Sequence, residues 1–171
     1  EKYINPGDIL VGSDSHTCTG GGLSAFSTGM GSTDIAIAIA TGKTWFRVPE
    51  TIKIELQGKL PSGTYAKDLA LLIMNIIGSA GATYKTIEFH GEGVENLSIS
   101  ERMTLANLAS EMGAKTAVFP PDKVLSTWVK EKHNLDIAQQ KKYLIWSDKD
   151  AKYCEEIEIN LDELEPLVAA P

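Results

Sequence analysis

The sequence has few cysteines, no long apolar run and no cluster of positive charge. Only two of its 171 residues are cysteine, too few for a disulfide framework, so a reducing cytosol is the expected compartment. The longest apolar runs, residues 35–40 and 69–77, fall short of the roughly 20 residues that cross a bilayer. Because the net charge is -7 and Lys and Arg are not clustered, neither nucleic acid nor an anionic membrane is an expected partner.

What the sequence contains is typical of a globular protein. Apolar residues make up 43% and charged residues 23%, and the length suits one α/β domain or one domain with part of another. The first residue is Glu1 rather than Met, and the final LEPLVAAP does not resemble a natural terminus. We therefore expect a segment of a longer protein, although removal of a tag would leave similar ends.

The order of elements predicts an α/β fold. Residues 8–13 predict a short buried strand, followed by a glycine-rich loop. Residues 33–41 predict a helix that is capped by Ser32 or Thr33, closed by Gly42, and buried because Ala and Ile crowd every face. Strands and helices then alternate, and a change in composition near residues 45–50 divides the chain into domains 1–49 and 50–171. The further expected strands are 51–58, 86–91, 115–121 and 155–164, and the further expected helices are 66–77, 100–112 and 122–132.

Two glycine motifs resemble nucleotide-binding loops, but neither has the required context. Gly42-Lys43-Thr44 resembles the end of a P-loop, yet Ile37 stands where that loop needs its first glycine. GGGLSA matches G-x-G-x-x-A, but six residues separate it from the predicted strand, and the dinucleotide fingerprint requires the turn at once. A nucleotide-binding function is therefore a weak alternative.

The segment GSDSHTCTGGG, residues 12–22, carries the first cluster of reactive side chains. His16 and Cys18 alone are a poor zinc signature. Asp14, Ser15 and His16 have the residue types of a hydrolase triad, but contiguous side chains are expected to diverge, so each needs a partner from elsewhere in the chain. The position after a strand is typical of α/β ligand sites, where glycines let the backbone approach an anionic substrate. A solvated turn is an equally weighted alternative.

A second polar cluster lies in the helix predicted over residues 100–112. Asn107 and Glu111 are four residues apart and therefore share one helix face. If Glu111 faced His16, the two side chains would form a coupled acid/base pair. Ordinary solvent-exposed polar residues are the alternative interpretation.

Taken together, several segments resemble the aconitase superfamily. They are residues 12–50, the strand TIKIELQG, and SERMTLANLASEMGAKTAVFPPD, and the resemblance is weakest over residues 125–153. The segments HTCT and TGKTWFRVPE favour the isopropylmalate/homoaconitate branch. The resemblance implies three-layer α/β/α domains, with the end of a first domain and most of a second. It also implies a hydro-lyase of leucine biosynthesis that isomerises 2-isopropylmalate to 3-isopropylmalate by dehydration and rehydration.

The resemblance also assigns roles to the reactive residues. Asp14 would pair with a histidine upstream of this sequence, and Ser15 would contact a substrate carboxylate. His16 would pair with Glu111, and Asn107 would lie near a [4Fe–4S] cluster. These implied pairs explain how adjacent side chains can each serve a different remote partner.

The cofactor and the partner implied by the resemblance lie outside this chain. The three cluster cysteines of the family belong to a G-S-C-T-N stretch and a C-x-x-C, which neither Cys18 nor Cys154 matches, so we expect no metal ligand here. Cys154 is expected to be a small buried residue beside the last strand. The serine that removes the carbon-bound proton would come from a small, swivelling subunit. The isolated chain is thus expected to be inactive, and a homoaconitase or aconitase-type enzyme or a silent carboxylate-binding α/β module remain alternatives.

Overall fold

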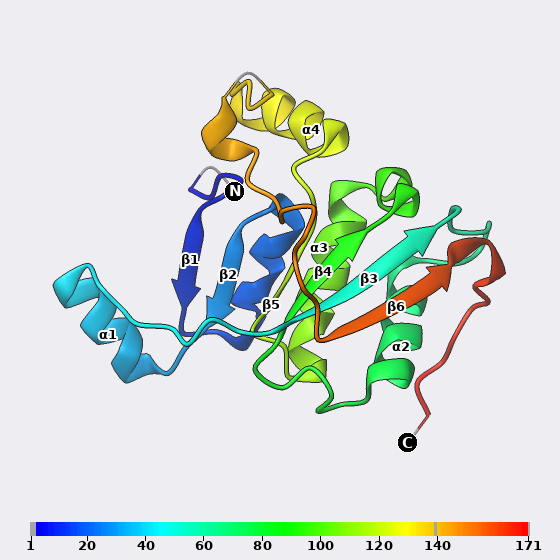
Figure 1. Cartoon of the computed structure of the whole chain (residues 1–171), viewed down its shortest axis with the longest axis horizontal. Coiled ribbons are helices and arrows are strands. Elements are labelled where there is room, and N and C mark those ends of the chain that lie inside the picture. Colours follow the sequence, from blue (N-terminus) through cyan, green and yellow to red (C-terminus); the bar gives the residue numbers. More distant parts are fainter. Residues whose placement is uncertain (1–2, 139, 171) are drawn as a thin grey trace.

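The computed structural model describes residues 3–138 and 140–170 and confirms an α/β fold built on two parallel sheets (Figure 1). The smaller sheet pairs β1 (Ile9–Gly12) with β2 (Phe26–Gly29). The larger sheet has the strand order β5-β4-β3-β6, with β3 (Thr51–Gln57), β4 (Thr86–His90), β5 (Thr116–Val118) and β6 (Glu155–Asn160). The α-helices are α1 (Ser32–Thr41), α2 (Ala66–Ile77), α3 (Ile99–Leu108) and α4 (Lys123–His133).

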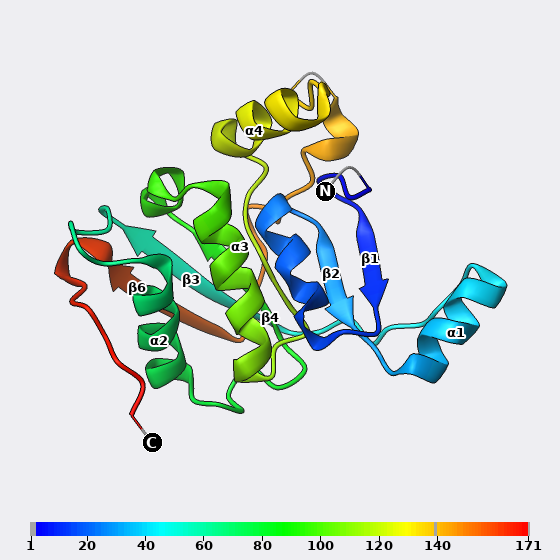
Figure 2. The same ribbon diagram turned by 180° about the vertical axis from the view of Figure 1, so that it is seen from behind.

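Helices α2 and α3 cover one face of the larger sheet and form the main core with it (Figure 2). Ile52, Ile54 and Phe89 alternate along β3 and β4, and each is at most 1% exposed on that face. The opposite face carries Lys53 and Glu88 among its polar side chains, and in the described part of the chain no helix covers it. The described residues therefore show the expected α/β fold, with helices on one face of this sheet and the polar side chains of its alternating strands on the other.

The N-terminal elements are more exposed than expected. Ile9 of β1 is 70% exposed and Leu10 is 39% exposed, and α1 has no buried residue. Both predictions of burial are therefore wrong for this chain. Figure 1 shows α1 projecting beside the smaller sheet, away from the other helices. Composition predicts a helix correctly, but burial depends on a neighbour, which α1 lacks among the described residues.

Several element boundaries differ from the prediction. Gly31 is the N-cap of α1, with no side-chain cap, and α3 begins one residue after Ser98, whose hydroxyl forms a capping box with Glu101. Residues 15–23, expected as a loop, form the 3-10 helix η1 (Ser15–Leu23), and β2 was not predicted. The proposed boundary near residues 45–50 falls in the irregular segment between α1 and β3 and stays a prediction.

A buried ion pair joins α3 to the start of α4. Arg102 of α3 is fully buried and donates to both carboxylate oxygens of Asp122, over 2.9 and 2.6 Å. The same guanidinium donates to the carbonyl oxygens of Val94 and Leu97. Asp122 also accepts from the N–H of Leu125 as the N-cap of α4. One aspartate thus both neutralises a buried cation and begins a helix.

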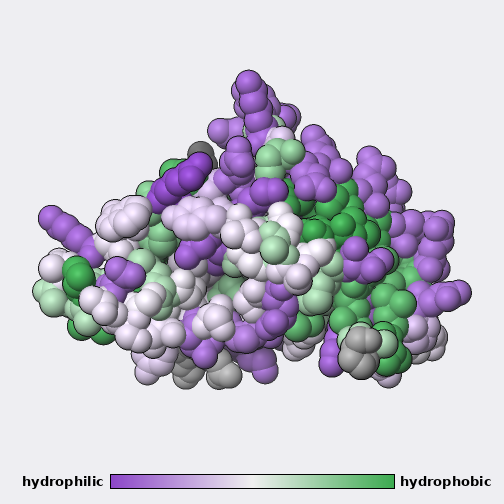
Figure 3. All heavy atoms as spheres, turned by 90° about the horizontal axis from the view of Figure 1, so that it is seen from below, coloured by the Kyte–Doolittle hydropathy of each residue, from purple (hydrophilic) through white to green (hydrophobic). Residues whose placement is uncertain are grey.

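The C-terminal segment is held against α2 by Asp68. The backbone N–H groups of Leu167 and Tyr65 donate to the two carboxylate oxygens of Asp68, over 2.8 and 2.7 Å. These hydrogen bonds hold the pKa of Asp68 below its ordinary value. Figure 3 shows apolar residues gathered on one side of the molecule, and Leu72 and Ile76 of α2 line one hollow together with Leu167 of the C-terminal segment.

Candidate active site

The segment that follows β1, residues 13–16, here called the DSH loop, meets the end of α3. After Leu108 the chain continues into the 3-10 helix η3 (Ala109–Met112), which carries Glu111. His16 Nε2 lies 3.2 Å from Glu111 Oε1, although 95 residues separate them in the sequence. The structure therefore brings together the two side chains that the sequence proposed as a pair.

The ring nitrogens of His16 have two different neighbours. Its Nδ1 lies 3.1 Å from Ser15 Oγ, so these adjacent side chains meet, contrary to the expectation that they diverge. Asp14 does not take the orienting position, since its Oδ1 accepts the backbone N–H of His16 over 2.7 Å and lies 3.8 Å from Nδ1. When Nε2 carries the ring proton and donates to Glu111, Nδ1 is free to accept the hydroxyl proton of Ser15.

The His16–Glu111 pair is open to solvent. The side chain of His16 is 41% exposed and that of Glu111 is 51% exposed. A ligand can therefore reach both groups, whereas water screens the attraction between them. The arrangement can hold and move a proton, but the described residues do not exclude water from it.

The three residues after His16 fix the backbone of the DSH loop. Each side chain donates to the carbonyl oxygen three positions earlier: Thr17 to Asp14 over 2.6 Å, Cys18 to Ser15 over 3.6 Å, and Thr19 to His16 over 2.7 Å. Local bonds of this kind are typical of Ser and Thr in turns. Threonine at positions 17 and 19 is the sequence signal for these hydrogen bonds, which were not predicted.

Asn107 joins α3 to η1 through two hydrogen bonds. Its Nδ2 donates to Thr19 Oγ1 over 2.9 Å, and its carbonyl oxygen accepts from Cys18 Sγ over 3.6 Å. Glu111 lies one helical turn further on and faces the same loop, as the four-residue spacing predicts. Asn107 thus helps to keep Glu111 beside His16.

The glycine run allows η1 to pack closely on three other elements. A Cβ at Gly21 would overlap Ala117 O of β5, and a Cβ at Gly22 would lie 2.7 Å from Met103 N of α3. At Gly20 the added atom would overlap Ser27 Oγ of β2. The sequence suggested that these glycines approach a ligand, but here they bring the backbone against β2, β5 and α3.

Replacing Gly21 by alanine is therefore expected to lower the free energy of unfolding by about 1–3 kcal/mol or more, as overpacking does. The new Cβ meets backbone atoms of Ala117, which cannot rotate away. Urea unfolding followed by circular dichroism would measure the change. Gly31→Ala is the matched control, since its Cβ would meet only the movable Asp34 side chain, at 3.2 Å. Equal midpoints for the two variants would contradict the close-packing explanation.

The two cysteines do not form a metal centre. Cys18 is 1% exposed, and burial raises the pKa of its thiol, which donates to carbonyl oxygens rather than standing free as a thiolate ligand. Cys154 is exposed rather than buried as predicted, because it precedes β6 at the sheet margin, with Sγ 3.2 Å from Thr51 O. Over residues 3–138 and 140–170, no three His, Cys, Asp or Glu side chains are grouped to hold a metal ion. These residues therefore do not fit a [4Fe–4S] cluster.

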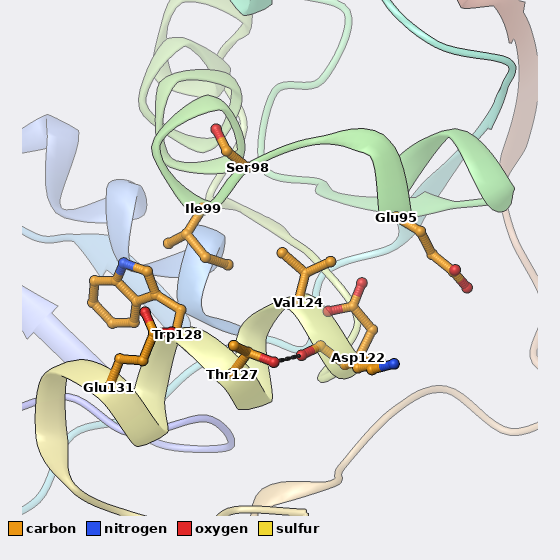
Figure 4. A pocket seen from close by; sticks show the side chains of 9 residues that line it. Glu95, Ser98, Ile99, Asp122, Val124, Thr127, Trp128 and Glu131 are labelled. Atoms are coloured by element: carbon orange, nitrogen blue, oxygen red, sulfur yellow. Dashed lines mark hydrogen bonds between the residues drawn. The ribbon is translucent and has the colours of Figure 1, made fainter.

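A hollow of about 500 Å³ lies away from the DSH loop, between α4 and the start of α3 (Figure 4). Ile99, Val124 and Trp128 give it an apolar wall, and Asp122 at its side is engaged by Arg102. It contains no acid/base pair comparable to His16 and Glu111. The reactive side chains of the chain and this hollow are therefore separate features.

No described helix is long and apolar enough to cross a bilayer. The model of the aconitase family (aconitate hydratase) matches residues 1–171. The chain is 50% identical over all of its length to "3-isopropylmalate dehydratase large subunit 1" of Thermotoga maritima, and 50% identical over 99% of its length to the protein of that name from Methanopyrus kandleri. It covers 40% and 39% of those proteins, respectively. Since the match spans every residue, the chain belongs to the aconitase family.

Proposed function

We propose that this chain is part of the large subunit of a 3-isopropylmalate dehydratase, a hydro-lyase of leucine biosynthesis. The reaction interconverts 2-isopropylmalate and 3-isopropylmalate by removing water and adding it back at the neighbouring carbon. The observation that carries the proposal is the contact of His16 with Glu111, in a chain about 50% identical to proteins of that name. The substrate is assigned from those relatives, and the proton chemistry from the geometry.

The DSH loop supplies a proton-handling group suited to dehydration. When the C–O bond of the substrate breaks, the departing hydroxide must receive a proton to leave as water, and a histidine near neutral pH can provide it. Glu111 orients the His16 ring through Nε2, so the doubly protonated ring can give its Nδ1 proton to the hydroxide and is left neutral, with Nδ1 free to accept. In the reverse direction the same ring accepts a proton from the incoming water.

Ser15 and Asp14 have proposed roles on either side of this histidine. The Ser15 hydroxyl is exposed beside Nδ1, where it can contact a substrate carboxylate. Asp14 is 77% exposed at its side chain and uses Oδ1 to cap η1, so its carboxylate can also pair with a histidine from another part of the enzyme. Asp14, His16 and Glu111 are thus the proposed catalytic residues.

The cofactor and the partner are proposed to come from outside residues 1–171. Because the described side chains do not fit a [4Fe–4S] cluster, its cysteines would belong to the remainder of the large subunit, with Asn107 near it. The relatives' designation as large subunits supports a small-subunit partner. We propose a cytoplasmic location, because a sequence with only two cysteines offers no disulfide framework.

Anaerobic reconstitution with iron and sulfide tests the proposal. We expect the 171-residue chain alone to show neither cluster absorbance nor hydration of isopropylmaleate. A full-length large subunit that contains this segment, mixed with its small subunit, should show both. Turnover by the isolated chain, or a metal-free complex that binds carboxylates without turnover, would contradict the proposal. Hydration of homoaconitate in preference to isopropylmaleate would identify the homoaconitase alternative.

A further inference from the structure

A hollow of about 350 Å³ adjoins η1 at Thr19, three residues after His16. It lies where α2, α3 and η1 stand side by side on one face of the molecule (Figure 2). Its lining combines one cation, three polar side chains and two apolar ones: Lys67, Thr19, Thr104, Asn107, Met103 and Leu108. The size is at the lower end of the range for small-molecule sites.

The hollow lies beside the face of α3 that leads along the chain to Glu111, the partner of His16. Thr104, Asn107 and Glu111 follow one another at three- and four-residue spacing and therefore share a helix face. Asn107 lies near the end of α3 and Glu111 in the 3-10 turn η3 that follows, so about one helical turn separates the hollow from the His16–Glu111 pair. Asn107 and Thr19 connect the two regions directly, since they bond to each other and Thr19 bonds to His16 O. A small diacid can span this separation.

Lys67 is the cationic group of the hollow. Its side chain is exposed, and it forms no ion pair with any residue in the described ranges 3–138 and 140–170. The backbone hydrogen bonds of the neighbouring Asp68, and to a lesser extent the Lys67 charge, lower the pKa of that carboxyl, but the two side chains form no ion pair. Asn107 adds a second donor, since only one of its two amide hydrogens is engaged by Thr19.

We propose that this hollow is a subsite for a carboxylate of the substrate, held by Lys67 Nζ and Asn107 Nδ2. Met103 and Leu108 form an apolar wall, against which the alkyl branch of the same substrate molecule can pack. The ligand class is therefore a branched aliphatic acid, and the assignment to the substrate rests on the proposed function. Lysine suits this role because it is a flexible point charge that can follow a small acid.

Titration of the 171-residue chain with 3-methylbutanoate tests the subsite without requiring catalysis. The acid should shift the NMR signals of the Lys67 side chain and the Asn107 amide, saturably. Lys67→Met should weaken binding roughly 2- to 5-fold, the size expected for a solvent-exposed ion pair, and Lys67→Arg should restore part of it. Lys123→Met is the matched control, because Lys123 is also exposed in the first turn of a helix.

The assembled enzyme provides a second readout. In the assembled enzyme, Lys67→Met should raise KM by about the factor by which it weakens 3-methylbutanoate binding, and it should leave the fold unchanged. Lys123→Met should change neither KM nor the fold. Saturable binding weakened only in Lys67→Met supports the subsite even if the assembled enzyme fails to hydrate isopropylmaleate, a failure that would reject the proposed function alone. Hydration with an unchanged KM in Lys67→Met, or equal shifts in both methionine variants, would overturn the subsite and leave the function standing.

Discussion

Replacing Asp122 by alanine is expected to lower the free energy of unfolding by about 3–5 kcal/mol, as for other buried ion pairs that lose one partner. Arg102 would remain fully buried without its carboxylate, keeping only the carbonyl oxygens of Val94 and Leu97 as acceptors. Helix α4 would also lose its N-cap, which typically contributes about 1 kcal/mol. Chemical unfolding of the purified chain would measure the loss.

The double variant Arg102→Met, Asp122→Ala separates charge burial from simple contact loss. Replacing both partners removes the uncompensated cation, so the double variant should be more stable than the sum of the two single effects predicts. Asp122→Asn should retain the cap and lose less than Asp122→Ala. Glu131→Ala, an exposed change on the same helix, is expected within about 0.5 kcal/mol of the parent and is the control. A loss below 1 kcal/mol for Asp122→Ala would show that the ion pair is unimportant for stability.

Replacing His16 by asparagine in the assembled enzyme is expected to lower kcat by roughly 10²- to 10⁴-fold, the usual contribution of a general acid or base. The side chain is 41% exposed, so the change should leave the unfolding midpoint nearly unaltered. Steady-state kinetics with isopropylmaleate would give kcat and KM separately. A raised KM with an unchanged kcat would show that His16 binds substrate without moving a proton.

Glu111→Gln tests whether the two residues act as a unit. The neutral amide oxygen accepts the Nε2 proton less strongly than a carboxylate, and the amide NH2 can instead donate to unprotonated Nε2, so nitrogen NMR of His16 should show a changed tautomer balance. The double variant should be little worse than His16→Asn alone, because residues acting together are not additive. Glu95→Gln, exposed and distant in the sequence, is the control. Independent, multiplying losses for His16 and Glu111 would contradict the coupled pair.

The strands of the larger sheet could be predicted from the sequence, because the alternation of apolar and polar residues is a local pattern. TIKIELQ alternates apolar and polar residues, and the structure uses that alternation to place Ile52 and Ile54 against the helices. Strand β2 has only four residues and no alternation that marks it, and it forms by pairing Phe26 with Ile9. The exposure of α1 could not be predicted either, because composition does not specify what packs against a helix.

In the candidate site, too, local patterns could be predicted from the sequence and tertiary contacts could not. Four-residue spacing placed Asn107 and Glu111 on one face, and the contact with His16 required the family resemblance as well as that spacing. The Thr17 and Thr19 hydrogen bonds depend on a 3-10 turn that spacing alone does not reveal. Lys67 was missed because its relation to the loop is entirely tertiary.

The unequal environments of the two cysteines make the chain a ready substrate for single-site labelling. A maleimide dye would attach at the exposed Cys154, whereas the buried Cys18, with its raised thiol pKa, would be spared while the chain stays folded. The attached dye would report from the margin of the larger sheet, remote in sequence from the DSH loop. Appearance of a second labelled site would then signal opening of η1, so that the native thiols form a folding sensor without any substitution.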